Sequence, residues 1–280
     1  MAATEGSGAQ WPLAAARGLR DQMPAVLAKS YGDQEGAEWW ERHEALFEDA
    51  RKEWGPRCAD VYRLAPAACD GRAAALAAAV WLQDPVRQAL ANGSPAALRS
   101  IVREVCRDGA GHAVYSLDLF TDTLCDTMLA ELDHLEASGI PLRRPNGMNR
   151  YGAILSYLGF QDGFLAPLMA WVVRPLASEL WPEWVAADDC DDIYGFIVRY
   201  RIGEDTDLAE HADTSNVTLN ACLGREFEGG ELCFKGVRFT GSAEEQEERI
   251  VAHRKGAALL HLGGHFHAAR AITAGERSNL

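Results

Sequence analysis

Two histidines and one aspartate stand at a spacing that could bind a metal ion. His211 and Asp213 are separated by a single residue, and His267 follows much later in the chain. Two imidazoles and one carboxylate on one face of an octahedral ion leave three positions open, which is the ligand set associated with non-haem Fe(II) oxygenases. We therefore take these three residues as candidate catalytic metal ligands.

An arginine after this set indicates the second component of the chemistry. Arg277 lies on what reads as the strand that follows His267. A guanidinium can bind a small dicarboxylate through paired, charge-assisted hydrogen bonds. The four residues together indicate iron and 2-oxoglutarate, with Arg277 as a further catalytic and cosubstrate-binding candidate.

The His-x-Asp spacing constrains the local backbone. Residues two apart on a strand share a face but lie ~6.5 Å apart along it, so His211 and Asp213 converge on one ion only where the strand ends and curls. The polar, glycine-containing segment 203–207 permits such an irregular approach. By itself the motif is a weak signal, because solvated His and Asp pairs are common on surfaces.

The segments around these residues give the motif its context. Residues 215–223 and 227–234 read as two strands with a glycine-rich turn between them, and residues 256–261 and 264–280 continue the pattern. From about Val114 to Leu280, including Arg144 to Gly152, the chain resembles the Fe(II)/2-oxoglutarate-dependent dioxygenase superfamily. The match is to the prolyl and lysyl hydroxylase branch, and especially to the group named 2-oxoglutarate and iron-dependent oxygenase domain-containing protein 2.

The resemblance implies a role for individual residues. His211, Asp213 and His267 are then the iron ligands, and Arg277 is the partner of the distal carboxylate of 2-oxoglutarate. Tyr200, on the expected strand 193–202, occupies the place where related enzymes have a tyrosine that hydrogen-bonds the cosubstrate.

Thr218, Asn220 and Cys222 alternate along one expected strand and therefore share a face. Asparagine is disfavoured in strands, which favours a polar role for Asn220 near 2-oxoglutarate, and Thr218 is a second cosubstrate-binding candidate. A buried Asn220 that satisfies backbone groups is the alternative.

The other histidines have less specific interpretations. His265 would share a strand face with His267, but the family pattern selects His267, which leaves His265 as a supporting or rim residue. His261 ends an apolar run and reads as a hydrogen-bonded core or edge residue. The remaining four read as surface residues, namely His43, His112, His134 and His253. Arg270 reads as a solvated arginine near the mouth of the site.

Charge and cysteine usage limit the classes of partner and compartment. The formal net charge is −14, with 41 acidic and 27 basic residues. We expect no nucleic-acid partner, because the overall field repels phosphate, and the only basic candidate patch is Arg143, Arg144 and Arg150. Seven scattered cysteines without a Cys-x-x-Cys pair predict free thiols in a reducing compartment, the cytoplasm or the nucleus. Residues 1–10 do not resemble a signal peptide, and we expect no membrane-spanning segment.

The hydrophobic patterns predict an α+β protein in two parts. Residues 1–110 read as a mostly helical region, with helices over 38–47, 70–82 and 94–106. We expect tryptophans 11, 39, 40, 54 and 81 to fill contacts between helices and core.

Residues 111–280 read as the oxygenase domain, an eight-stranded double-stranded β-helix (jelly roll) with supporting helices. A strand over 113–117 precedes helices over 122–137 and 163–180, and residues 193 onward are rich in strands. The charge run 244–248 reads as a solvated turn. In the resembling families the strand of Arg277 continues further, so the sequence predicts fewer ladder bonds around Arg277.

The function that the resemblance implies is hydroxylation of a protein or peptide side chain, as in prolyl and lysyl hydroxylases. O2 and 2-oxoglutarate are consumed at Fe(II), succinate and CO2 are released, and ascorbate serves as reductant. Three alternatives stay open at this point: a hydroxylase of free amino acids or other small molecules, a non-catalytic metal-binding interaction module of the same fold, and a hydrolytic Zn(II) site.

Overall fold

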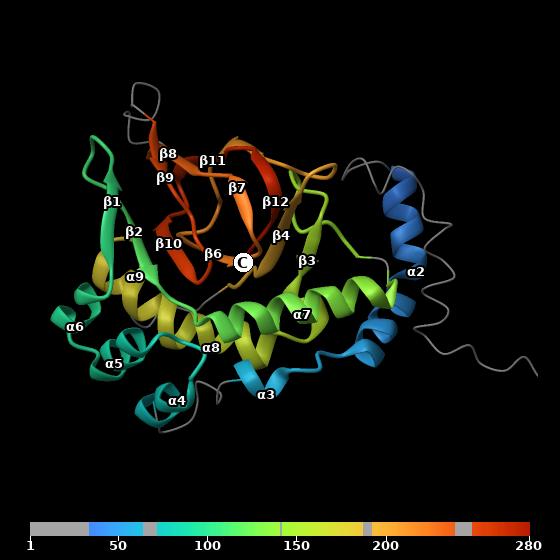
Figure 1. The fold of residues 1–280 in the computed structure, drawn as a ribbon, viewed down its shortest axis with the longest axis horizontal. Coiled ribbons are helices and arrows are strands. Elements are labelled where there is room, and N and C mark those ends of the chain that lie inside the picture. Colours follow the sequence, from blue (N-terminus) through green and yellow to red (C-terminus); the bar gives the residue numbers. More distant parts are fainter. Residues whose placement is uncertain (1–33, 64–71, 141, 187–191, 239–247) are drawn as a thin grey trace, which may run out of the picture.

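The computed structural model describes residues 34–63, 72–140, 142–186, 192–238 and 248–280. Helices precede the sheets in the chain, and the β-strands gather on one side of the molecule (Figure 1). These helices are α2 (Gln34–Trp54), α3 (Ala59–Tyr62), α4 (Arg72–Ala78), α5 (Asp84–Asn92) and α6 (Pro95–Ser100).

Local sequence signals set the ends of these helices. The left-handed Gly93 ends α5, and the Ser94 hydroxyl accepts a hydrogen bond from the Ala97 amide at the start of α6, where Pro95 needs no amide partner. The expectation for the tryptophans is confirmed for the four that lie in described helices or loops, since Trp39, Trp40, Trp54 and Trp81 are all buried. Trp11 lies outside the described residues.

Two antiparallel sheets form a barrel. The larger sheet has the order β1, β2, β10, β6, β12, β4, β3, with β7 paired to β12, and the smaller has the order β5, β11, β8, β9. The strands of the larger sheet are β1 (Arg103–Arg107), β2 (Ala113–Asp118), β3 (Gly152–Ile154), β4 (Phe196–Arg201), β6 (Val217–Gly224), β7 (Phe227–Gly229), β10 (Ala257–Leu262) and β12 (Ile272–Asn279). Those of the smaller sheet are β5 (Leu208–His211), β8 (Leu232–Val237), β9 (Arg249–Val251) and β11 (His265–Ala269). The predicted α+β fold with a double-stranded β-helix is confirmed.

Two longer helical segments pack beneath the larger sheet (Figure 1). The predicted helix 122–137 is observed as α7 (Asp122–Ser138). The predicted helix 163–180 is a run of short segments, namely η1 (Leu155–Leu158), η2 (Gln161–Leu165), α8 (Ala166–Leu168), η3 (Met169–Val173) and α9 (Arg174–Leu180). The two wide π turns, η2 and η3, come just before Pro167 and Pro175. Proline has no amide to donate, so each interrupts the regular ladder at that point.

The barrel divides the apolar side chains into two cores. One core joins the helices to the outer face of the larger sheet and contains Trp81, Leu119 and Phe164. The other lies between the two sheets and consists of Val114, Val198, Tyr200, Leu232, Phe234, Leu259, Ala269 and Ile272. On β6, Ala221 and Leu223 belong to the first core. Asn220 lies opposite Leu259 of the second core, so Thr218, Asn220 and Cys222 face the barrel interior together, as the alternation predicts.

Two expectations about the chain are corrected. The helix predicted over 94–106 is wrong in its second half, because Cys106 lies on β1, which pairs with β2; cross-strand pairing overrides the local helical pattern there. The sheet therefore begins at Arg103 rather than after residue 110. The expected loss of ladder bonds at the last strand is also wrong, since the Leu280 amide and carbonyl both bond Ala221 and Arg277 lies opposite Tyr200.

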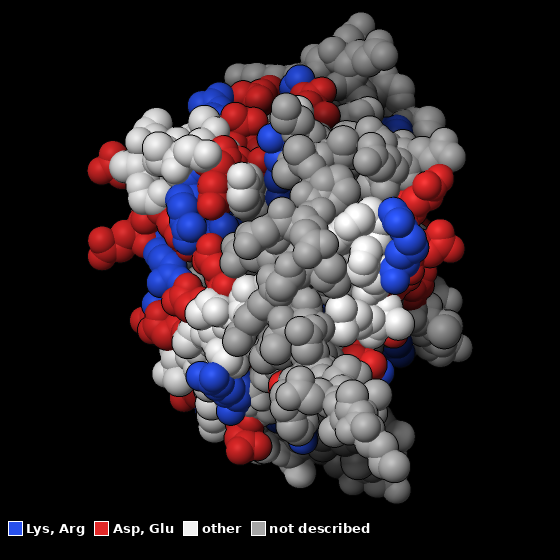
Figure 2. All heavy atoms as spheres, turned by 90° about the vertical axis from the view of Figure 1, so that its right-hand side faces the viewer, with Lys and Arg blue, Asp and Glu red and all other residues white. Residues whose placement is uncertain are grey.

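Charges of both signs are mixed over the described surface that Figure 2 shows. Arg199 and Arg201, for example, pair with Glu136 and Glu204. Of the predicted charge run 244–248, residues 244–247 lie outside the described residues, and Glu248 pairs with Arg270 at 2.8 Å. Within the described ranges, no helix is both long and apolar enough to cross a membrane.

Candidate active site

The barrel brings His211, Asp213 and His267 together at one end of the smaller sheet. His211 ends β5 and lies directly opposite His267 in the register of β5 with β11. One potential ligand atom from each residue lies within 4.8 Å of the other two. Nε2 of His211 is 3.6 Å from Oδ1 of Asp213, and Nε2 of His267 is 3.9 Å from Oδ2. These distances suit three ligands on one face of a single ion.

The backbone makes the curl that the His-x-Asp spacing requires. β5 ends at His211, and the amide of Asp213 then donates to the carbonyl of Gly263 at 2.8 Å. A bulge between His267 and Ala269 shifts the register with β5 on the neighbouring strand. Asp213 thus leaves the ladder and turns its carboxylate toward both imidazoles.

Hydrogen bonds orient each of the three side chains. Nδ1 of His211 lies 2.9 Å from the carbonyl of Ala209, and Nδ1 of His267 lies 2.9 Å from the carbonyl of His265. Because a carbonyl only accepts, Nδ1 carries the proton in both rings, and Nε2 presents its lone pair to the centre. The Thr218 hydroxyl donates to Oδ2 of Asp213 at 2.6 Å.

Burial favours the neutral form of His267, which is the form that binds a metal ion. Burial lowers the pKa of His267, and the carboxylate of Asp213 opposes this shift. The neutral imidazole is the form that binds a cation. The donor set therefore fits a divalent ion such as Fe(II), held by His211, Asp213 and His267.

Arg277 lies inside the barrel with its side chain fully buried. Its guanidinium carbon is 4.5 Å from the ring centre of Tyr200, its register partner on β4, and Nη1 donates to the carbonyl of Gly230. Nε and Nη2 have no hydrogen-bond partner, and Arg277 has no ion pair with any residue that the structure describes. Buried donors without acceptors are costly, so these two nitrogens suit a carboxylate ligand.

Gly230 is a site residue that sequence reasoning missed. A side chain there would place its Cβ 2.8 Å from Nη1 of Arg277, and the backbone has a φ of +70°. Only glycine combines this conformation with this close approach. The adjacent pair Gly229-Gly230 was the signal in the sequence, where it reads as an ordinary turn.

Comparisons with known proteins show which proteins the chain is similar to. The family described as "OGFOD2-like domain" matches residues 74–186, a range that precedes the three candidate ligands. The mouse 2-oxoglutarate and iron-dependent oxygenase domain-containing protein 2 is 39% identical over 167 residues, which are 60% of this chain and 47% of the relative. Protein ICU11 of Arabidopsis thaliana, also named a 2-oxoglutarate and iron-dependent oxygenase domain-containing protein, is 40% identical over 175 residues, 60% of this chain and 44% of the relative.

This chain is a homologue of the 2-oxoglutarate and iron-dependent oxygenase domain-containing proteins. It spans about half the length of these curated relatives. The rat multifunctional procollagen lysine hydroxylase and glycosyltransferase LH3 is 31% identical over 189 residues, 63% of this chain and 23% of that protein. Among solved structures, a Pseudomonas putida prolyl-4-hydroxylase aligns with a TM-score of 0.40 and 17% identity over 61% of this chain and 85% of that one.

The three other predicted cosubstrate residues of this oxygenase homologue have different surroundings. Tyr200 lies against Arg277, and burial raises the pKa of its hydroxyl. Thr218 holds Asp213, which makes it a support for the metal ligand. The side-chain oxygen of Asn220 accepts from the Asn279 amide at 2.8 Å inside the barrel. Contact of Tyr200, Thr218 or Asn220 with 2-oxoglutarate stays a prediction.

The histidines need one correction. His253 is buried rather than on the surface, and Nε2 lies 3.1 Å from the Ala257 carbonyl. Burial, followed by the charge of Arg277, lowers the pKa of His253 to about 4, so it is neutral at pH 7. His265 supports His267 through its own carbonyl, and the expected core position of His261 is confirmed. The other three predicted surface histidines are half-buried.

The hydrogen bond from Thr218 to Asp213 predicts a test of the metal centre. Thr218→Val removes the hydroxyl and keeps the shape, so the affinity for Mn(II), used in place of Fe(II), should fall by about 10- to 100-fold. Thr218→Ser keeps the hydroxyl and serves as the matched control, with affinity near that of the parent. Calorimetric titration measures both, and a valine variant that binds Mn(II) as tightly as the parent would contradict the supporting role of Thr218.

Nε and Nη2 of Arg277, which have no hydrogen-bond partner among the described residues, predict a second test, which measures 2-oxoglutarate binding. Arg277→Lys keeps a positive charge but loses the planar fork, so the dissociation constant for 2-oxoglutarate should rise about tenfold or more in the Mn(II)-loaded protein. Mn(II) affinity should stay unchanged. Arg270→Lys, at an exposed arginine paired with Glu248, is the control. Equal 2-oxoglutarate affinity in Arg277→Lys and the parent would show that another residue holds the distal carboxylate.

Proposed function

We propose that this chain is an Fe(II)- and 2-oxoglutarate-dependent dioxygenase that hydroxylates the side chain of a protein or peptide. The observation that carries the proposal is the pairing of two features inside one barrel. Three potential ligand atoms gather within 4.8 Å at its end. In its interior, two nitrogens of the buried Arg277 guanidinium have no hydrogen-bond partner in the described part of the chain. The first feature suits the ion and the second suits the carboxylate of a cosubstrate.

Each residue has a defined task in this proposal. His211, Asp213 and His267 hold the ion, and Thr218 fixes the orientation of the Asp213 carboxylate. Arg277, set by Gly230 and Tyr200, binds the distal carboxylate of 2-oxoglutarate and thereby directs its 2-oxo acid end toward the ion. When bound, iron would supply the chemistry that converts 2-oxoglutarate, O2 and a substrate C–H group to succinate, CO2 and the hydroxylated substrate, with one oxygen atom of O2 entering succinate and the other entering the hydroxylated substrate. The inner core around Phe234 and Leu259 limits the access of water to the reaction.

The proposal also includes a reductant and a cellular compartment for this activity. Ascorbate is the proposed reductant that keeps the iron in its ferrous form. We also propose a reducing intracellular compartment, cytoplasm or nucleus. Its support is that the five described cysteines, Cys58, Cys106, Cys125, Cys222 and Cys233, are free thiols.

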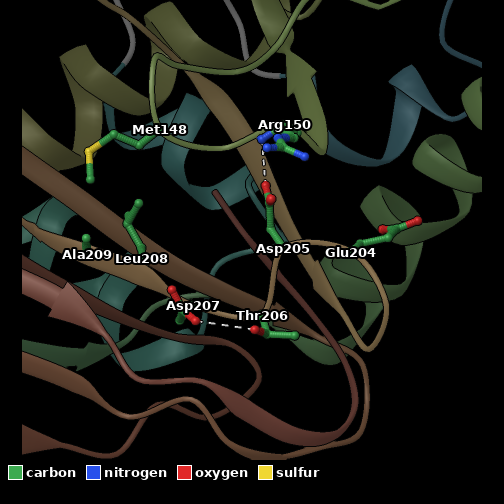
Figure 3. Close-up of a pocket in the computed structure, with 8 residues that line it drawn as sticks. All are labelled: Met148, Arg150, Glu204, Asp205, Thr206, Asp207, Leu208 and Ala209. Carbon is green, nitrogen blue, oxygen red and sulfur yellow. Dashed lines mark hydrogen bonds between the residues drawn. The ribbon is translucent and has the colours of Figure 1, made fainter. Parts of the chain in front are cut away.

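A groove beside the metal centre supports a polypeptide substrate. It has a volume of about 380 Å³ and runs between the loop of Met148 and the strand β5 (Figure 3). Its lining consists of Met148, Arg150, Glu204, Asp205, Thr206, Asp207, Leu208 and Ala209. The carbonyl of Ala209 orients His211, so this wall of the groove directly adjoins the metal site. Among the described strands β5 is also the edge of its sheet, a place where an extended peptide can dock.

The opposite wall of the groove is held in a fixed conformation. Oδ1 of Asn146 accepts from the amides of Met148 and Asn149, at 2.8 and 2.7 Å. Oδ2 of Asp205 accepts from the amides of Arg150 and Tyr151, at 2.5 and 3.3 Å, which joins this loop to the segment that leads into β5 (Figure 3). A preformed wall lowers the entropic cost of peptide binding.

The charges of the groove favour a basic segment in the substrate. Three carboxylates and one guanidinium line it. Asp205 is engaged by the loop amides and Glu204 by Arg199 and Arg201. The carboxylate of Asp207 is bonded by the Thr206 hydroxyl at 3.3 Å and remains available for a cation. The lysine hydroxylase named among the relatives also fits a polypeptide substrate.

Turnover tests the reaction itself. The protein with Fe(II), ascorbate and 2-oxoglutarate should release succinate, and a randomised peptide library should gain single oxygen atoms detectable by mass spectrometry only when all components are present. Asp213→Ala should abolish both signals, while Asp207→Ala keeps succinate release. No oxygen in any peptide, together with strong stimulation of succinate release by a free amino acid, would replace the polypeptide proposal by the small-molecule alternative. Full turnover by Asp213→Ala would contradict the iron site.

The groove gives a separate prediction about substrate selection. Asp207→Lys should raise the KM for hydroxylated peptides that contain lysine or arginine by about tenfold, because an attractive contact becomes repulsive. Their kcat and the peptide-independent succinate release should change little. Asp60→Lys, on α3 outside the groove, makes the same change of charge as a control. An equal KM in Asp207→Lys and Asp60→Lys would exclude Asp207 from substrate binding.

A further inference from the structure

His261 is a fully buried histidine that the proposed reaction does not use. It lies on β10 and is 0% exposed. Its ring centre is 4.8 Å from that of His267, in an edge-on contact, and 5.1 Å from that of Phe234. In the register of β10 with β6, His261 stands opposite Thr218, the residue that holds Asp213. His261 therefore adjoins one candidate metal ligand, His267, and the residue that supports another, Asp213.

The two ring nitrogens of His261 have different surroundings. Nδ1 lies 2.8 Å from the carbonyl of Leu262. Because the carbonyl only accepts, Nδ1 carries the ring proton, and Nε2 is a bare lone pair. Nε2 is buried and has no hydrogen-bond partner among the residues that the structure describes.

A buried acceptor of this kind requires a donor. The metal ion and the two carboxylates of 2-oxoglutarate offer no hydrogen to donate. A water molecule on the ion does, and the ion's charge polarises its O–H bonds. His261 is not among the three residues whose potential ligand atoms converge within 4.8 Å, but its ring lies against that of the candidate ligand His267. This position suits contact with a molecule bound to the ion rather than with the ion itself.

We propose that His261 is a positioning residue of the metal centre, whose Nε2 accepts a hydrogen bond from a water molecule bound to the ion. The inference rests on the proposed metal site. It assigns His261 the task of retaining water at an open coordination position until substrates displace it. A consequence is that His261 restrains the consumption of 2-oxoglutarate in the absence of a hydroxylatable substrate.

Water exchange in the Mn(II)-loaded protein tests this proposal without turnover. ¹⁷O NMR relaxation of the solvent reports the residence time of water on Mn(II). In His261→Phe, which keeps a planar ring but removes the acceptor, the residence time should shorten about tenfold, as expected for one lost hydrogen bond to a polarised donor. Mn(II) affinity should remain within about twofold, because His211, Asp213 and His267 are unchanged. His261→Gln, which offers an amide oxygen, should recover part of the residence time.

His253→Phe is the matched control. His253 is also a buried barrel histidine, but its Nε2 is bonded to Ala257 and its Nδ1 lies 3.4 Å from the Asn279 amide nitrogen. Its substitution should leave water exchange at the parent value. A residence time in His261→Phe equal to the parent's would overturn the proposal. A loss of Mn(II) affinity of about 100-fold or more would also overturn it, because His261 would then be a ligand itself.

A measurement on the parent protein makes the test independent of any variant's folding. In protein labelled with ¹⁵N-histidine, Nε2 of His261 should appear as an unprotonated nitrogen, and its resonance should shift toward that of a hydrogen-bond acceptor when Zn(II) is added. A protonated Nε2, or a resonance that Zn(II) does not move, would contradict the proposal. Failure of the parent to bind Mn(II) or Zn(II) would overturn the proposed function together with this inference, whereas normal binding without these changes overturns the inference alone.

Discussion

The buried charge of Arg277 is the constraint on which the rest of the site depends. Removing a guanidinium from water costs several kcal/mol unless acceptors replace the water. The chain supplies one carbonyl, from Gly230, and the ring face of Tyr200. Two nitrogens have no hydrogen-bond partner among the described residues, so these residues compensate the charge only in part. A carboxylate ligand would complete the compensation, which is the physical basis of the role proposed for Arg277.

The alternation of side chains along each strand places the polar residues of the site on the inner face of the barrel. Along β6, successive side chains face the helices or the barrel interior, so the larger sheet can carry an apolar core on one face and Thr218 and Asn220 on the other. The antiparallel register places His211 opposite His267. The helices beneath the larger sheet then fix that sheet without entering the barrel. Metal ligands, arginine and supporting side chains thus come from different strands of one rigid framework, which favours precise geometry.

Residue types, strand period and the family resemblance together predicted the candidate ligands, Arg277 and the shared face of Thr218, Asn220 and Cys222. The structure brings the three candidate ligands together and confirms the shared face, while iron binding and the role of Arg277 stay predictions. The sequence could not predict the bond from Thr218 to Asp213 or the burial of His253, because each depends on which strand lies next to which. It also failed at β1, where pairing with β2 overrides a helical pattern. The bare nitrogen of His261 is likewise visible only once its carbonyl partner is placed.

Anaerobic titration of the protein with Fe(II) and then 2-oxoglutarate tests whether the three candidate ligands and Arg277 form one site. A 2-oxo acid that chelates Fe(II) through its carboxylate and oxo group produces a visible charge-transfer absorption. One Fe(II) should bind per chain, and this absorption should grow until one 2-oxoglutarate is bound per iron. Pyruvate, which lacks the distal carboxylate, should need a far higher concentration. Absence of the absorption, or equal binding of 2-oxoglutarate with and without iron, would show that these residues do not form such a site.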